Sequence, residues 1–221
     1  IFARYLDPAF RDRVLCSVDR NGCPKRGMVV IDGVPSSSDI VTQAHRKPSA
    51  RPQHQHSTQP LSGSRSQSTG HLNFAIERDY DPQAQVMGME LEGIDIAVLY
   101  PTQGLSYLAR DGMDPHLSLA ICQAYNNWIY EFTEYSPDRL KWVALLPLHD
   151  VNLACLELTR CVNELGAVGS MVRPNRINGH FWHSNYWNSL FALHEELDVT
   201  MGFHEGTGAH YSHMNVLYGE N

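Results

Sequence analysis

The 221-residue sequence lacks several features that would quickly assign it to a class of protein. No apolar run approaches the roughly 18 residues that cross a bilayer, so we expect no membrane association. Outside one short tract there is no basic stripe, and the formal net charge of -7 argues against nucleic-acid binding. No G-x-G-x-x-G motif or P-loop follows an apolar strand, which disfavours a doubly wound nucleotide-binding protein.

Cysteine is also sparse. The five cysteines are odd in number, scattered along the chain and without a C-x-x-C pair. This usage is typical of reduced thiols rather than of a disulfide framework, so it predicts an intracellular, cytoplasmic protein. The hydrophobic fraction of 43% is ordinary and indicates one large or two small globular domains with a sizeable core.

Residues 35–73 are rich in Ser, Gln, His, Pro and Arg and contain few apolar residues. Such a tract buries too little surface to offset its ordering entropy, so we expect it to be disordered. It separates an N-terminal segment, 1–34, of loop, short helix and one short strand at 28–32, from a regular part, 74–221. His54 and His56 within the tract match a His-x-His metal pair. A catalytic pair should end a buried apolar strand, so we assign this one no role.

From Asp81 onward helix and strand signals alternate. The caps Asp81, Asp114 and Asp150 each predict the start of a helix. After Asp81, the apolar residues recur at helical spacing and predict one apolar face, made of Ala84, Met87, Leu91 and Ile94. Apolar strands are expected at 94–100, 140–148, 167–172 and 199–204.

Continuous apolarity in these strands, as in the IDIAVLY run at 94–100, predicts burial on both faces, as in a parallel sheet. Right-handed crossovers would make the four strands parallel, so that their carboxyl ends share one rim. The fold class expected is therefore α/β. Polar side chains follow the strands at this rim: Tyr100, Thr102, Gln103, His149, Asp150, Arg173, Asn175, His204, Glu205 and Thr207.

Arg173 and His204 stand out among these rim residues because each ends an apolar strand. Arginine offers a fixed cation, and a neutral imidazole can bind a metal. For each of the others a structural role, such as the helix cap of Asp150, is at least as good an explanation. Their convergence on one rim predicts a functional site.

Several motifs resemble the amidohydrolase-related family, in the branch of hydrolases and decarboxylases that includes aminocarboxymuconate-semialdehyde decarboxylase. The resemblance covers about residues 74–210 and the YLDPAFRDR stretch near the start. The motifs that carry it are Tyr100-Pro101-Thr102, Pro137-Asp138-Arg139-Leu140, Gly166-Ala167-Val168-Gly169, Val172-Arg173-Pro174-Asn175 and Gly202-Phe203-His204-Glu205-Gly206.

The resemblance implies a distorted (β/α)8 TIM barrel that binds one divalent metal, most often zinc, with manganese as the other candidate. By position His204 matches the metal ligand that ends the fifth family strand. We place Tyr100, Arg173, Asn175 and Glu205 in the substrate-binding site and assign no catalytic residue.

The family's other metal ligands have no match in this sequence. The strand-1 pair would precede Ile1, and the strand-6 histidine and strand-8 aspartate would follow Asn221. We therefore expect a partial barrel of about four βα units, family strands 2–5, within a fragment. His210 and His213 could supply alternative ligands.

Two functions follow from these observations. The first is a metal-dependent hydrolase or non-oxidative decarboxylase that acts on a small carboxylated or aromatic molecule, with a homo-oligomer left open. In it the metal would polarise a substrate oxygen or activate water. The second is a non-catalytic scaffold or binding protein that keeps the βα core without a functional metal site.

Overall fold

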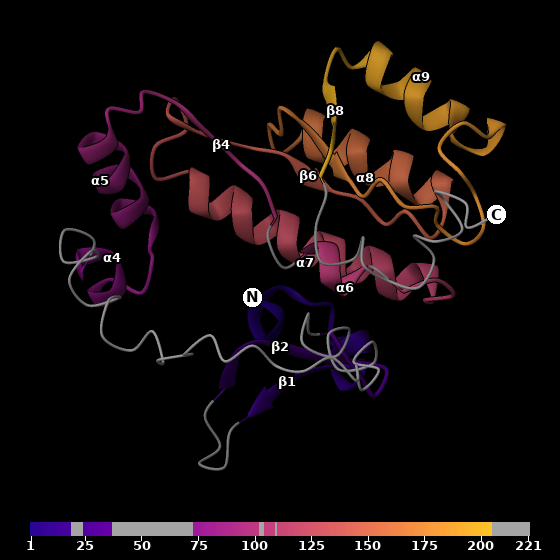
Figure 1. Ribbon diagram of the computed structural model, residues 1–221, viewed down its shortest axis with the longest axis horizontal. Coiled ribbons are helices and arrows are strands. Elements are labelled where there is room, and N and C mark those ends of the chain that lie inside the picture. The colour runs from indigo at the N-terminus through magenta and orange to yellow at the C-terminus, as the bar shows by residue number, and fades with distance from the viewer. Residues whose placement is uncertain (19–23, 37–72, 102–103, 109, 205–221) are drawn as a thin grey trace, which may run out of the picture.

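The computed structural model describes residues 1–18, 24–36, 73–101, 104–108 and 110–204. Figure 1 shows three groups of elements around the long helix α7 (Pro115–Thr133): an N-terminal sheet on one side, the parallel strands and later helices on the other, and two helices near one end. Among the described residues no helix is both long enough and apolar enough to cross a bilayer.

The N-terminal part is a small antiparallel sheet in the order β1-β2-β3, preceded by two short helices. Its elements are α1 (Phe2–Tyr5), η1 (Pro8–Arg13), β1 (Val14–Val18), β2 (Pro24–Ile31) and β3 (Val34–Ser36). Ion pairs fasten it to α7, because Arg4 contacts Glu131 and Arg13 contacts Asp114, each at 2.7 Å. Arg13 also makes a two-bond fork with Asp32, which closes the sheet against the start of α7.

Of the predicted N-terminal strand at 28–32, residues 28–31 form the second half of the longer strand β2, and Asp32 lies in the turn that follows. The tract expected to be disordered begins and ends in regular structure, because Pro35 and Ser36 belong to β3 and Asn73 begins α4 (Asn73–Glu77). The rest of that tract lies outside the described residues.

The regular part follows the predicted order of helices and strands. Its elements are α5 (Pro82–Glu92), β4 (Ala97–Leu99), α6 (Gly104–Tyr107), α7, β5 (Leu140–Trp142), β6 (Ala144–Leu145), α8 (Val151–Asn163), β7 (Gly169–Val172), η3 (Asn185–Trp187), α9 (Asn188–Glu196) and β8 (Thr200–Phe203). The caps of the three predicted helices are confirmed, since the carboxylates of Asp81, Asp114 and Asp150 each accept a hydrogen bond from a first-turn amide.

All the predicted core strands are parallel, as expected. β4 pairs with β5, and β6, β7 and β8 form a second parallel ladder. The single strand expected at 140–148 is wrong in one respect, because it divides into β5 and β6. At the division the chain changes its partner strand from β4 to β7. Val143 N donates to Leu99 O at the end of β4, whereas Ala144 pairs with Ser170 in β7.

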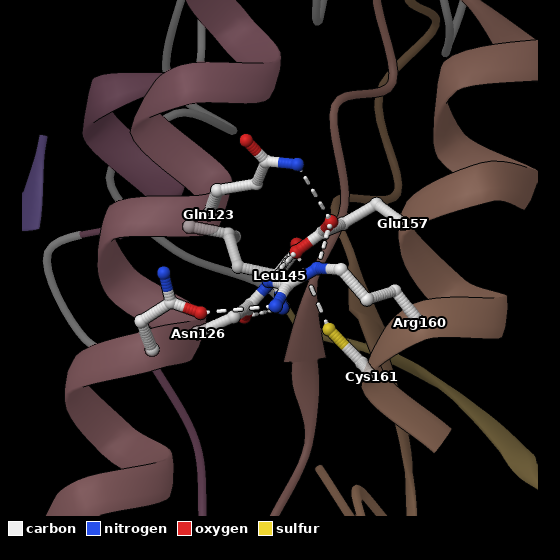
Figure 2. Close-up of polar contacts among 7 residues, drawn as sticks. Gln123, Asn126, Leu145, Glu157, Arg160 and Cys161 are labelled. Atoms are coloured by element: carbon white, nitrogen blue, oxygen red, sulfur yellow. Dashed lines mark hydrogen bonds and ion pairs between the residues drawn. The ribbon is translucent and has the colours of Figure 1, made fainter. Parts of the chain in front are cut away.

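A buried polar cluster joins α7 and α8 to this division point (Figure 2). Asn126 is fully buried, and its amide group makes two 2.9 Å hydrogen bonds with the backbone N and O of Leu145. The same side chain donates to Glu157 at 2.7 Å, and Arg160 holds Glu157 through a two-bond fork of 2.9 and 2.7 Å. The Asn126 side chain thus satisfies the backbone N–H and C=O of Leu145 on the side of β6 where no described strand pairs with it.

The prediction that strand 94–100 is buried on both faces is wrong. Ala97 and Leu99 turn toward the core, whereas alternate residues are exposed: Ile94, Ile96, Val98 and Tyr100. Period-two alternation in a strand sends these residues to the opposite face, and no described segment covers that face.

The apolar face predicted for the first helix is also wrong. In α5 the buried residues are Ala84 and Met89, and Met87 and Leu91 are exposed. The helix lies beside α4, at the far end of the molecule from α8 and α9, so little of its surface meets the core (Figure 1). Its end is as expected, with Gly93 at φ 68°.

Candidate functional site

The carboxyl ends of the parallel strands bring three of the predicted residues to one rim. Tyr100 follows β4, Arg173 follows β7 and His204 follows β8. The Ser170 hydroxyl bonds His194 of α9, so Ser170 faces the helices. Strand alternation then sends Met171 and Arg173 to the opposite, inner face.

Tyr100 and His204 are brought together although their strands lie at opposite ends of the curved parallel array. Their ring centroids are 6.1 Å apart, and His204 N donates to Val172 O at 2.9 Å. Gly202 makes this approach possible, because a Cβ at that position would lie 3.0 Å from the Tyr100 hydroxyl oxygen. The His204 side chain is exposed to solvent at this rim.

Arg173, which follows β7, is buried and lines an apolar pocket. Its side chain is 7% exposed, and Nη2 donates to Asp111 Oδ1 at 3.1 Å. The pocket is partly open to solvent, and its cavity volume is about 20 Å³, close to the space that one water molecule needs. The other residues that line it are Gly104, Leu108, Leu145, Leu146, Leu148 and Met171. An arginine among apolar side chains favours an anionic group over a neutral one as its partner.

The remaining predicted site residues are Asn175 and Glu205. Asn175 is only 5% exposed, two residues beyond Arg173, in a turn where Trp182 Nε1 donates to Arg173 O at 2.8 Å. Glu205 lies outside the described residues, as do the alternative metal ligands His210 and His213 and the His54–His56 pair.

Asp111 is the rim residue that sequence reasoning missed. It lies in the connection between α6 and α7, three residues before the cap Asp114, and nothing in its local pattern distinguishes it. The connection is fastened on both sides of Asp111. Arg110 O bonds His149 Nε2 at 2.8 Å, and Gly112 N donates to Asn178 Oδ1 at 2.8 Å.

His149 is a structural residue in this rim rather than a metal ligand. Its Nε2 must carry the proton, since the Arg110 carbonyl only accepts, and its Nδ1 bonds the Ser118 hydroxyl at 2.8 Å. Burial lowers the pKa of His149, and the nearby Arg173 charge acts in the same direction. Burial likewise lowers the pKa of His194, whose ring bonds Ser170 and Leu190 O.

These two histidines predict loss of stability in mild acid. Because the folded state favours the neutral rings, their contribution is fully present above the ordinary histidine pKa of 6.5. It is lost as pH falls below 6.5 and through the lowered folded-state values. We expect the urea midpoint to fall between pH 7.5 and 5, and the fall to be smaller in His149→Gln, where the amide can make both hydrogen bonds. Parallel pH profiles for the two proteins would contradict this account.

The described residues do not by themselves make a metal site. Within the part of the chain that the structure describes, no three His, Cys, Asp or Glu side chains are grouped so that they could hold an ion. A catalytic zinc normally has three protein ligands. His204 could supply one of them, and we derive no chemical step through a metal.

Parallel βα units define an α/β protein, and its candidate site lies at the carboxyl-terminal rim of the strands. A family model described as amidohydrolase matches residues 69–220, more than half of the chain, so the chain belongs to the amidohydrolase family. The family resemblance noted from the motifs is thereby confirmed.

Two curated relatives are a hydratase and a decarboxylase by name. The chain is 30% identical over 135 residues to a 2-keto-4-carboxy-3-hexenedioate hydratase of Sphingobium sp., which covers 54% of this chain and 39% of that protein. It is 41% identical over 96 residues to a gamma-resorcylate decarboxylase of Rhizobium radiobacter, covering 41% of this chain and 29% of that protein. The chain thus spans well under half the length of the curated relatives it matches.

Among solved structures, the chain is similar in fold to a 5-carboxyvanillate decarboxylase of Novosphingobium aromaticivorans. That protein was solved as a complex with manganese and 4-hydroxy-3-methoxy-5-nitrobenzoic acid. The two are 20% identical with a TM-score of 0.52, over 76% of this chain and 46% of that one.

Proposed function

We propose that this chain is part of a metal-dependent amidohydrolase-family enzyme that acts on a small carboxylated, aromatic substrate. The observation that carries the proposal is the position of Tyr100, Arg173 and His204 at the carboxyl ends of parallel strands, where the rings of Tyr100 and His204 meet and Arg173 lines an apolar pocket. The names of two relatives support a lyase reaction, either decarboxylation or hydration. The family name also makes hydrolysis a candidate reaction.

In this proposal each residue has a distinct task. Arg173 holds the substrate carboxylate, because a buried guanidinium in an apolar wall favours an anion over a neutral group. Tyr100 orients the ring from across the rim, and His204 supplies one imidazole ligand to a divalent metal. The metal would supply Lewis-acid chemistry when bound. The other metal ligands would come from residues outside those described. Asn175 and Glu205 remain proposed substrate-binding residues.

We further propose that strands β4 to β8 belong to a larger (β/α)8 barrel. Two observations support it. The inner residues Ile96 and Val98 of the first strand are exposed although they are apolar, as expected of a face that further barrel strands would cover. The array also curves so strongly that Tyr100 reaches Gly202 on β8.

Metal content tests the enzyme proposal. After incubation with manganese or zinc and desalting, we expect the purified chain to retain metal when measured by mass spectrometry. His204→Ala should lose it, and a control at the exposed His116, His116→Ala, should not. Turnover is measured separately, as carbon dioxide release from gamma-resorcylate. A folded protein that retains neither metal nor activity would favour the alternative, a non-catalytic protein with the same βα core.

A further inference from the structure

We propose that Asn178 is a positioning residue: from the tip of a two-residue hairpin turn, its side chain ties together three connections at the carboxyl-terminal rim. These connections are residues 110–114 between α6 and α7, 146–150 between β6 and α8, and 173–184 between β7 and η3. The inference rests on the proposed function, because the candidate site lies on these connections. It gives a task to a residue outside the proposed substrate-binding set.

The turn that presents this side chain follows from an Asn-Gly pair in the sequence. Asn178 and Gly179 have φ values of 50° and 81°, and two positive values are typical of the type I′ turn that Asn-Gly favours. Ile177 and His180 close the turn with two backbone hydrogen bonds of 3.1 and 2.9 Å. The turn therefore fixes the point from which the Asn178 side chain leaves the backbone.

Both arms of this turn are anchored, so its tip has a fixed place on the rim. Ile177 is 1% exposed and belongs to the hydrophobic core. The His180 ring stacks on the Tyr186 ring, with the centroids 3.8 Å apart and the planes 7° from parallel. The Tyr186 hydroxyl in turn accepts a hydrogen bond from Val151 N at 3.1 Å. Because these contacts do not involve the Asn178 side chain, a change in that side chain should leave the turn in place.

The Asn178 side chain makes one hydrogen bond to each of the two other connections. Its Oδ1 accepts from Gly112 N at 2.8 Å, and its Nδ2 donates to His149 O at 3.3 Å. His149 completes the arrangement, because its Nε2 donates to Arg110 O at 2.8 Å. The backbone is therefore held immediately before and immediately after Asp111 by two residues that are bonded to each other.

The contact between Asp111 and Arg173 spans two of the tied connections. Asp111 Oδ1 accepts from Arg173 Nη2 at 3.1 Å, although the two residues are 62 positions apart. Asn178 follows Arg173 in the same connection and bonds the residue after Asp111. Its bond to Gly112 thus fixes the two connections relative to each other, whatever further contacts Arg173 makes. We expect loss of this bond to loosen the rim and admit water to His149, which is 5% exposed.

The test replaces Asn178 by glycine in the full 221-residue chain. Glycine adopts a positive φ without strain, so Asn178→Gly keeps the turn and removes only the side-chain bonds. By nuclear magnetic resonance, the Gly112 amide should exchange with solvent about threefold to tenfold faster, the effect of losing one hydrogen bond. Asn178→Asp, which keeps an acceptor, should restore the slower exchange. Asp198→Gly is the matched control and should change nothing, since Asp198 is also exposed and has a positive φ of 53°.

A second measurement separates positioning of the rim from support of the turn. Burial lowers the pKa of His149, and the charged groups that act on this ring are Arg110, Asp111 and Arg173. The substitution alters none of these charges. Burial is the largest of the causes, so entry of water should raise the His149 pKa toward its ordinary value of 6.5. His194, whose pKa burial also lowers, is the internal reference and should not change when the ring protons are titrated.

The outcomes separate the positioning role from the proposed function. Faster exchange of Gly112 together with a raised His149 pKa supports the positioning role, whether or not the chain retains metal or releases carbon dioxide from gamma-resorcylate. A change in only one of these two signals, or in neither, would overturn it and leave Asn178 a residue of the turn. Equal shifts of His149 and His194 would also overturn it, because they indicate loosening of the whole fold. Absence of metal and turnover alongside the expected shifts counts against the enzyme alone.

Discussion

Substitution of Arg160 by methionine is expected to destabilise the fold by about 3–5 kcal/mol, the cost of leaving a buried carboxylate without its counterion. Glu157 is 1% exposed, and the guanidinium of Arg160 is its charged partner in the described structure. The remaining contacts of the carboxylate are neutral donors on Gln123, Asn126 and Cys161 (Figure 2). Urea unfolding at pH 7, followed by circular dichroism, measures the change.

The chain offers a matched control for this substitution. Arg78 and Asp81 form an ion pair of the same i,i+3 spacing on the surface, where both side chains are 37% exposed. Arg78→Met should leave the urea midpoint almost unchanged, because exposed pairs contribute little. The double variant Arg160→Met with Glu157→Gln should recover part of the loss, since it removes the buried charge as well. If the single and double variants unfold at the same urea concentration, charge burial does not explain the effect.

Substitution of Gly169 by alanine is expected to destabilise the protein by about 3 kcal/mol through overpacking against backbone. A Cβ at Gly169 would lie 2.7 Å from both the carbonyl oxygen and the hydroxyl oxygen of Thr200, its partner in β8. A side chain could turn away, but the carbonyl is held in the β7–β8 ladder. The variant should also weaken metal retention by His204, which follows that ladder. Chemical denaturation and metal content are the two measurements.

Gly88→Ala is the control for a glycine that has no such neighbour. Gly88 lies inside α5, and a Cβ there would meet nothing within 4 Å. Alanine at this position should raise stability by about 0.5–1 kcal/mol, because glycine disfavours a helix interior. If both alanine variants change stability equally, the close approach of β7 and β8 is not the cause of the loss at Gly169.

Much of the fold could be predicted because its signals are local. Helix caps at Asp81, Asp114 and Asp150, and the apolar runs between helices, depend on residues a few positions apart. The parallel arrangement followed from the length of the connections. The two faces of strand 94–100 could not be read in this way, because burial depends on what the rest of the molecule places against each face.

For the candidate site, too, the local features were predictable and the long-range contacts were not. The sequence alone predicted that Tyr100, Arg173 and His204 lie at the ends of three of the four apolar strands, since each strand boundary and the polar residue at it are neighbours in the sequence. Only the tertiary structure decided that Tyr100 packs against Gly202 and that Asp111, 62 positions before Arg173, provides its carboxylate partner. Such contacts are made by the curvature of the strands and by the path of a connecting loop, and neither leaves a pattern in the local sequence.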